Sequence, residues 1–186
     1  MLDVEFIREL LLYYARFVPK KVLIESFVQL KTDRPDGYDE LVAELSALPD
    51  DRVISDIDTF VFSINEKYLS DRIRNNKGTI LFVEYSNIVI PDGSVKEIGQ
   101  SIYITVAGEI TISNNDMYAE MLKMSRYLDI LNRIISYMDN DQRGDKWCNS
   151  RKVIVYPCNI QVVDPRVFYD RAGWSAEFKT VKEVYV

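Results

Sequence analysis

Histidine is absent from the 186 residues of this chain. The usual general base near neutral pH, the base of Ser-His and Cys-His nucleophile pairs and the commonest metal ligand are therefore missing. Cysteine is scarce as well, because Cys148 and Cys158 are the only two and supply too few ligands for a structural zinc site. These absences exclude most hydrolase and zinc-enzyme templates, and we expect no catalytic residues, no metal site and no cofactor.

Glycine and basic residues are also few. The seven glycines are scattered and match neither the dinucleotide-binding pattern nor the P-loop pattern, which excludes nucleotide binding by those motifs. A formal net charge of −6 opposes bulk attraction to nucleic acid or anionic lipid. The composition predicts no specific nucleic-acid partner, and nothing in it indicates a small-molecule substrate.

Long apolar runs are missing too. No stretch approaches the roughly 20 residues of a membrane span, and residues 1–5 carry acids where a secretory signal would carry a basic stretch. We therefore expect a cytoplasmic protein that makes no membrane contact. In that compartment Cys148 and Cys158 are expected as free thiols, with a bridge between them as the open alternative.

Apolar residues, at 47%, are sufficient to fill one core, so we expect a single domain over residues 1–186. Residues 2–18 have the periodicity of an amphipathic helix that ends at Pro19, and residues 38–48 predict a short helix closed by Pro49. The apolar pieces at 22–24 and 27–28 are too short to classify.

Residues 116–138 give the clearest helical pattern, with Ser113, Asn114 and Asn115 as capping candidates. Its apolar stripe consists of Met117, Met121, Met124, Leu128, Leu131, Ile135 and Met138. Such a stripe is more often ordinary core, while its methionines would also suit a docking surface for a partner helix.

Alternating apolar and polar residues predict strands at 57–64, 79–85 and 101–106, and two more at 152–163 and 167–181. The last two are expected to pair as an antiparallel hairpin, and the polar stretch 139–149 is expected to be a loop. The fold class is therefore α+β. An antiparallel β-sheet should pack against one long helix, with an N-terminal helix and a C-terminal β-hairpin.

Three sets of residues could carry chemistry or contacts. Asp164, Glu177 and Lys179 resemble the Mg²⁺ site of restriction-type nucleases, although a surface Glu-x-Lys pair commonly arises by chance. The acids Asp50, Asp51, Asp56 and Asp58 could bind a cation or form a solvated loop. Twelve tyrosines could enrich an assembly interface or line the rim of the core, among them Tyr13, Tyr14, Tyr68, Tyr85, Tyr118, Tyr127 and Tyr137.

The order of helix, strands, long helix and closing hairpin resembles the small tail-terminator and tail-completion proteins of long-tailed bacteriophages. Residues 60–66 and 78–85, and the closing residues 172–178, are similar to segments of proteins encoded in prophages of gut Bacteroides-type bacteria. This resemblance implies a virion or assembly component, a tail protein or a head-to-tail connector. It carries no catalytic residues with it.

The leading hypothesis is a non-enzymatic, phage-derived structural protein that self-associates and contacts other virion proteins. It would be found in the host bacterial cytoplasm during assembly or in the virion, and the terminal hairpin and residues 139–149 would meet its neighbours. The alternatives are a Mg²⁺-dependent nuclease that uses Asp164, Glu177 and Lys179, and a cytoplasmic protein-binding module that uses the methionine-lined helix.

Overall fold

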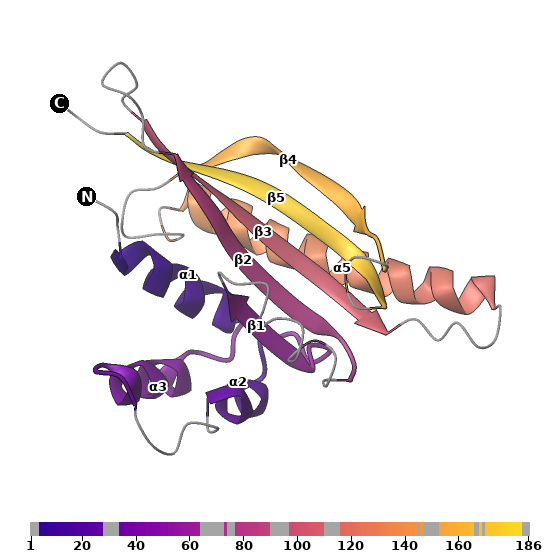
Figure 1. Ribbon diagram of the computed structural model, residues 1–186, viewed down its shortest axis with the longest axis horizontal. Helices are drawn as coiled ribbons and strands as arrows, with labels where there is room; N and C mark the ends of the chain where they lie inside the picture. The colour runs from indigo at the N-terminus through magenta and orange to yellow at the C-terminus, as the bar shows by residue number, and fades with distance from the viewer. Residues whose placement is uncertain are drawn as a thin grey trace.

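A five-stranded sheet lies at the centre of the computed structural model (Figure 1). The structure describes residues 4–27, 34–63, 73, 77–89, 97–109, 116–144, 146, 153–165, 168 and 170–183. Its helices and strands, in chain order, are α1 (Val4–Ala15), α2 (Lys20–Phe27), α3 (Tyr38–Ala47), β1 (Thr59–Ser63), β2 (Ile80–Val89), β3 (Glu97–Glu109), α5 (Met117–Arg143), β4 (Val153–Val163) and β5 (Arg171–Glu183).

The strands lie in the order β1-β2-β3-β5-β4, with β1 and β4 at the two ends. The pair β1–β2 is parallel, and the other three pairs are antiparallel. The α+β class, the long helix on the sheet and the C-terminal hairpin are confirmed, while the sheet is mostly rather than wholly antiparallel. The strand β5 separates its hairpin partner β4 from β3, which leaves β4 at the edge.

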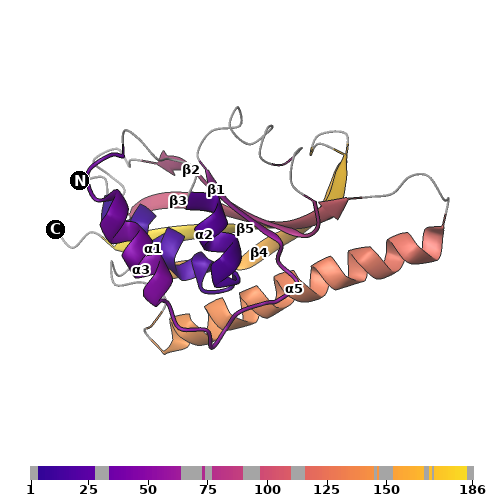
Figure 2. The same ribbon diagram turned by 90° about the horizontal axis from the view of Figure 1, so that it is seen from below.

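One face of the sheet is covered by helices (Figure 2). Helices α1 and α5 bury their apolar residues there, because each presents one apolar stripe to the alternate residues of β2, β3 and β5. This main core includes Phe6, Tyr14, Phe17, Leu81, Val83, Ile102, Ile104, Ile130, Ile134 and Phe178. A smaller cluster on the opposite face contains Val61, Ile73, Ile80 and Phe82, with Phe168 packed against it.

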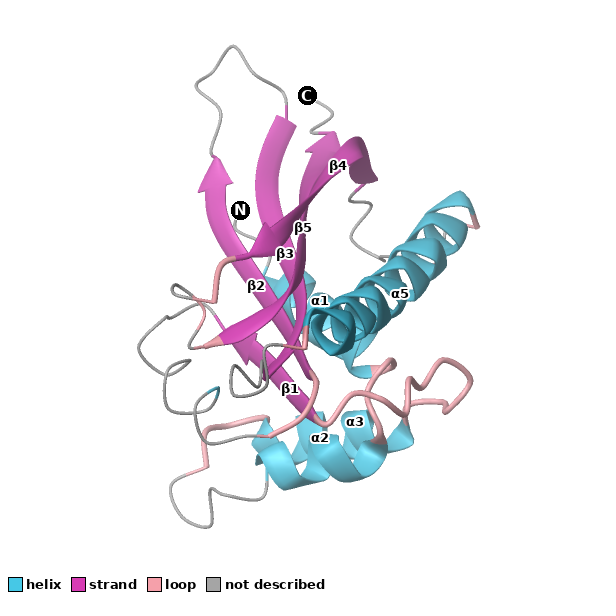
Figure 3. Ribbon diagram, turned by 90° about the vertical axis from the view of Figure 1, so that its right-hand side faces the viewer, coloured by secondary structure: helices cyan, strands magenta, loops and turns pink. Residues whose placement is uncertain are grey.

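The described part of the N-terminal region contains three helices, one more than the two predicted from the sequence. The segment that was too short to classify forms α2, which lies with α3 at the β1 end of the sheet (Figure 3). Helix α1 ends at Ala15, ahead of Pro19, and the expected strand at 57–64 shortens to Thr59–Ser63. Ile54 and Ile57 are fully buried just before that strand. Their apolar side chains explain why the sequence pattern predicted a strand that begins before Thr59.

Helix α5 differs from its prediction at both ends. Its N-cap is Asp116, whose carboxylate accepts hydrogen bonds from the backbone N–H groups of Tyr118 and Ala119 at 3.1 Å each. The capping candidates Ser113, Asn114 and Asn115 lie outside the described residues. The helix continues to Arg143, so the prediction of a loop from residue 139 is wrong for residues 139–143, and the remainder of that stretch is largely outside the description.

The hairpin strands begin and end close to their predicted positions. Strand β4 spans Val153–Val163, whereas β5 starts at Arg171 rather than at residue 167. The register shifts between Val155 and Asn159, and Pro157 lies in this irregular stretch. A proline cannot donate a ladder hydrogen bond, so its place at a bulge on an edge strand agrees with its chemistry. Within the part of the chain that the structure describes, no helix has the length and apolar character to cross a membrane.

Strands β3 and β5 approach so closely at Gly173 that a side chain is excluded there. A methyl group on Gly173 would collide with the Val106 carbonyl oxygen and would lie 2.5 Å from the Cα atom of Ala107. Because the obstruction is backbone in the middle of the sheet, it cannot rotate away, unlike the end of a flexible side chain.

We predict that Gly173→Ala lowers the free energy of unfolding by about 1–3 kcal/mol, the usual cost of overpacking. Urea denaturation followed by circular dichroism measures this change. The matched control is Gly144→Ala after α5, where the nearest atom to the new methyl group would be the Asn140 carbonyl oxygen at 3.5 Å. That control should stay within about 0.5 kcal/mol of the wild type. Equal effects at the two glycines would contradict the prediction.

Candidate interaction surface

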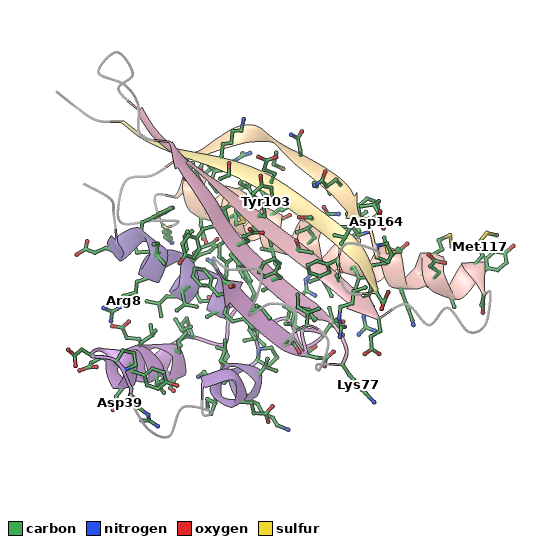
Figure 4. All side chains as sticks on the ribbon, in the orientation of Figure 1. Arg8, Asp39, Lys77, Tyr103, Met117 and Asp164 are labelled. Carbon is green, nitrogen blue, oxygen red and sulfur yellow. The ribbon has the colours of Figure 1, made fainter. Side chains whose placement is uncertain are left out.

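The first two turns of α5 carry apolar side chains that are exposed to solvent. The exposed fractions are 71% for Met117 and Tyr118, 55% for Met121 and 65% for Leu122. We call these four residues the α5 end. Figure 4 shows Met117 at the free tip of the helix, and Figures 1 and 2 agree that this tip projects beyond the sheet.

The length of α5 explains this exposure. A helix of 27 residues is about 40 Å long, and the sheet covers only its C-terminal part. The buried face of α5 begins at Tyr127 and continues with Ile130, Leu131, Ile134, Met138 and Asp141. Close to the start of this buried face, the Met124 carbonyl oxygen accepts a hydrogen bond from Trp174 Nε1 at 2.9 Å. Residues 116–123, N-terminal to that bond, are all exposed.

The apolar stripe predicted from the sequence is therefore divided. Leu131 and Met138 are buried, as a core stripe requires, while Met124, Leu128 and Ile135 are half-buried. Met117 and Met121 are exposed, so the core interpretation is wrong for them. The exposure of Met117 and Met121 is compatible with the alternative, in which methionines of this helix form a docking surface.

A second exposed apolar region lies on the edge strand β4. Residues 159–162 are all exposed, with 40% of Ile160 and 57% of Val162 open to solvent. Ile160 opposes Ala176 and Val162 opposes Trp174, so their side chains lie on the helix-covered face of the sheet. We call residues 159–163 the β4 edge. Sequence reasoning placed a strand here but did not single out Ile160 and Val162, although their alternation with Asn159 and Gln161 was visible.

The proposed nuclease residues do not form one group. Val163 pairs with Gly173, so Asp164 comes level with Ala172, and Glu177 lies five residues further along β5, about 17 Å away. Glu177 accepts a hydrogen bond from the Tyr103 hydroxyl at 3.2 Å, and Lys179 is exposed. The hairpin register thus separates Asp164 from Glu177 by more than one metal ion can bridge.

The clustered acids have protein partners in place of a cation. Asp50 pairs with Lys20 and Asp51 with Arg16, both at 3.4 Å, and Asp56 pairs with Arg126. The Asp58 carboxylate accepts a hydrogen bond from the Thr79 backbone N–H at 2.8 Å. Across the described residues, no three cysteine, aspartate or glutamate side chains are grouped so as to hold a metal ion.

The tyrosines that were singled out mostly belong to the core. Tyr13, Tyr14, Tyr85 and Tyr127 are buried, and Tyr137 is half-buried. Tyr118 is exposed at the α5 end, and Tyr68 lies outside the described residues. An interface role therefore stays open for Tyr118, whereas the four buried tyrosines serve packing. Of the cysteines, Cys158 is half-buried and burial raises the pKa of its thiol, while Cys148 lies outside the description.

The described structure also contains a buried ionic cluster, centred on Asp141 near the C-terminal end of α5. Arg52 donates two hydrogen bonds to the Asp141 carboxylate, and the Tyr13 hydroxyl donates a third at 2.8 Å. The Arg52 guanidinium also lies over the Tyr137 ring, 5.1 Å from its centre. Asp141 lies in the stretch expected as a loop, and sequence reasoning missed it.

Burial and hydrogen bonding shift two pKa values in this cluster. Burial raises the pKa of the Tyr13 hydroxyl, and its bond to Asp141 raises it further. Burial acts to raise the pKa of Asp141 as well, but hydrogen bonds from Arg52 and Tyr13 outweigh it, so the net pKa is lowered. Both carboxylate oxygens are occupied by protein donors, which makes this cluster a structural anchor.

We predict that Asp141→Asn lowers the free energy of unfolding at neutral pH by about 3–5 kcal/mol, because Arg52 loses the anion that compensates its burial. Since the folded pKa of Asp141 lies below the unfolded one, the stability it contributes is present above about pH 4 and is lost as the pH falls through the folded pKa. The variant should therefore lose less stability than the wild type on acidification below about pH 4.

Chemical denaturation at several pH values measures both effects. The matched control is Asp139→Asn in the same helix, where Asp139 pairs with the exposed Arg143 at 2.8 Å. An exposed pair contributes about 1 kcal/mol or less. Wild-type stability in Asp141→Asn at neutral pH would show that the cluster is not an anchor.

Comparisons of the chain with protein-family models, curated proteins and solved structures find no match.

Proposed function

We propose that this chain is a non-enzymatic, phage-derived structural or assembly protein of the tail or the head-to-tail junction. It acts by self-association and by contacts with other virion proteins, in the host bacterial cytoplasm during assembly or in the virion. The exposed α5 end is the observation that carries the proposal. Four large apolar side chains on adjacent turns are costly to leave in water and are typical of a surface that another protein covers.

The composition of the α5 end supports a protein partner in particular. Methionine and tyrosine are enriched at protein interfaces, and methionine adapts its shape to different partners. The nearest charged side chains, Asp116, Glu120 and Lys123, are exposed around it. An apolar centre with a charged rim is the usual organisation of a specific interface.

A protein-binding module is the second candidate, and the exposure of Met117 and Met121 favours it. It differs from the first proposal in its partner, which would be a helix or groove of an unrelated protein rather than a neighbouring subunit. The nuclease alternative receives no support from the hairpin register, which separates Asp164 from Glu177.

We predict that the wild-type protein forms an oligomer and that the double substitution Met121→Lys and Leu122→Lys weakens it. Removing central apolar anchors of an interface typically costs more than 1 kcal/mol, so the dissociation constant should rise by about 10-fold or more. Light scattering over a broad concentration range, at two salt concentrations, gives the absolute mass. Since the association is apolar, added salt should not dissolve it.

Ile24→Lys is the matched control, because Ile24 on α2 is 45% exposed and lies at the other end of the strand order. It should keep the wild-type mass. A monomeric wild-type protein at high concentration would overturn self-association. An oligomeric wild type with a monomeric control variant would move the interface away from the α5 end.

A further inference from the structure

We infer that the β4 edge pairs with the β4 edge of a second copy of this chain, in antiparallel register about Gln161, so that two sheets become one. This inference rests on the proposed self-association and names the surface and the partner. Edge strands present a row of unpaired backbone groups, and proteins that stay monomeric block such edges with charges, prolines or covering segments.

Among the described residues, the backbone groups of β4 that point away from β5 can be identified. Ile154 opposes Thr180, yet its N–H and C=O bond outward to the Gln142 side chain, at 2.7 Å and 3.1 Å. In an antiparallel ladder, alternate residues point both groups to the same side. Ile160 opposes Ala176, and Val162 opposes Trp174. Ala176 and Trp174 are each an even number of residues from Thr180 along β5, so their pairs with β4 have the same hydrogen-bonding pattern as the pair of Thr180 with Ile154. The backbone groups of Ile160 and Val162 therefore point away from the sheet.

The two halves of β4 are protected differently. Gln142 occupies the outer edge at Ile154, and Pro157 with the register shift interrupts the middle of the strand. Residues 159–163 follow as a regular ladder with β5, and residues 159–162 are exposed. The unprotected half is thus a short, regular segment at one end of the strand.

Charge favours a second copy as the occupant. The chain carries a net charge of −6, which opposes most contacts between identical molecules, but residues 159–163 contain no charged side chain. Antiparallel pairing about Gln161 places Ile160 opposite Val162 of the partner and Val162 opposite Ile160 of the partner. Apolar residues then meet on the helix-covered face, and like charges are not brought together.

Strand β1, at the other end of the sheet, is a poorer site for head-to-tail strand pairing. Strand β1 is short, and its first three residues, Thr59, Phe60 and Val61, are buried. Pairing of the β4 edge with the same edge of a second copy produces a twofold dimer. Pairing of five residues covers less than the roughly 800 Å² per partner of a stable interface. The α5 end, exposed on the same side of the sheet, supplies apolar surface to extend it.

The test uses two double variants of the full chain. One carries Ile160→Lys and Val162→Lys, and the other carries Ile160→Glu and Val162→Glu. Each variant alone places like charges opposite each other across the twofold axis. The dissociation constant of its dimer should therefore be roughly 100-fold higher than that of the wild type. An equimolar mixture of the two should recover the dimer mass, because lysines then face glutamates. Light scattering measures all three samples.

Two further measurements separate pairing from other effects. At concentrations low enough for the wild type to be monomeric, thermal unfolding of each variant should match the wild type, since both positions are exposed. The control Ile24→Lys should keep the wild-type mass. Hydrogen exchange should show protected Ile160 and Val162 amides in the dimer and fast exchange in the lysine variant.

An oligomer that persists in both variants, or a mixture that stays monomeric, would overturn the β4 pairing and leave self-association standing. A monomeric wild type would overturn both.

Discussion

The Asp141 carboxylate ties the helical layer together at the C-terminal end of α5. It binds Arg52 from the segment before β1 and Tyr13 from α1, so one buried charge on α5 holds two distant parts of the chain. An anion out of water is tolerable only while both donors stay in position. This requirement fixes the C-terminal end of α5 against α1. Because α5 is longer than the surface it covers, fixing that end leaves the opposite end projecting past the sheet.

The sequence was sufficient for the long helix, the two hairpin strands and the α+β class, because their periodicity extends over many residues. It failed where a local pattern was short or where the environment decided. Eight residues of α2 give too few periods to identify a helix. Asp141 looked like part of a polar loop, since a charge normally marks the surface. Its spacing from Ile134 and Met138 continues the buried face of α5, and that spacing was the signal that could have revealed it.

The candidate surface was predictable only in part, for a similar reason. Met117 and Met121 belong to the same helical stripe as Leu131 and Met138, and no local property distinguishes the exposed pair from the buried pair. The difference arises where the sheet ends, at the bond from Trp174 to Met124, which joins residues far apart in the sequence. Strand order is equally non-local. The hairpin β4–β5 could be predicted, but not the insertion of β5 beside β3 that moves β4 to the edge.

The unequal protection of β4 bears on what its exposed half does. An open, uncharged, apolar edge carries a risk of aggregation, and a single lysine or proline would remove that risk without disturbing the core. The same strand already contains such devices, since Gln142 covers Ile154 and Pro157 lies where the ladder is irregular. The chain therefore blocks its edge up to the point where Ile160 and Val162 begin. An edge that is left open beside one that is blocked is better explained by a contact that needs it than by a fold indifferent to its edges.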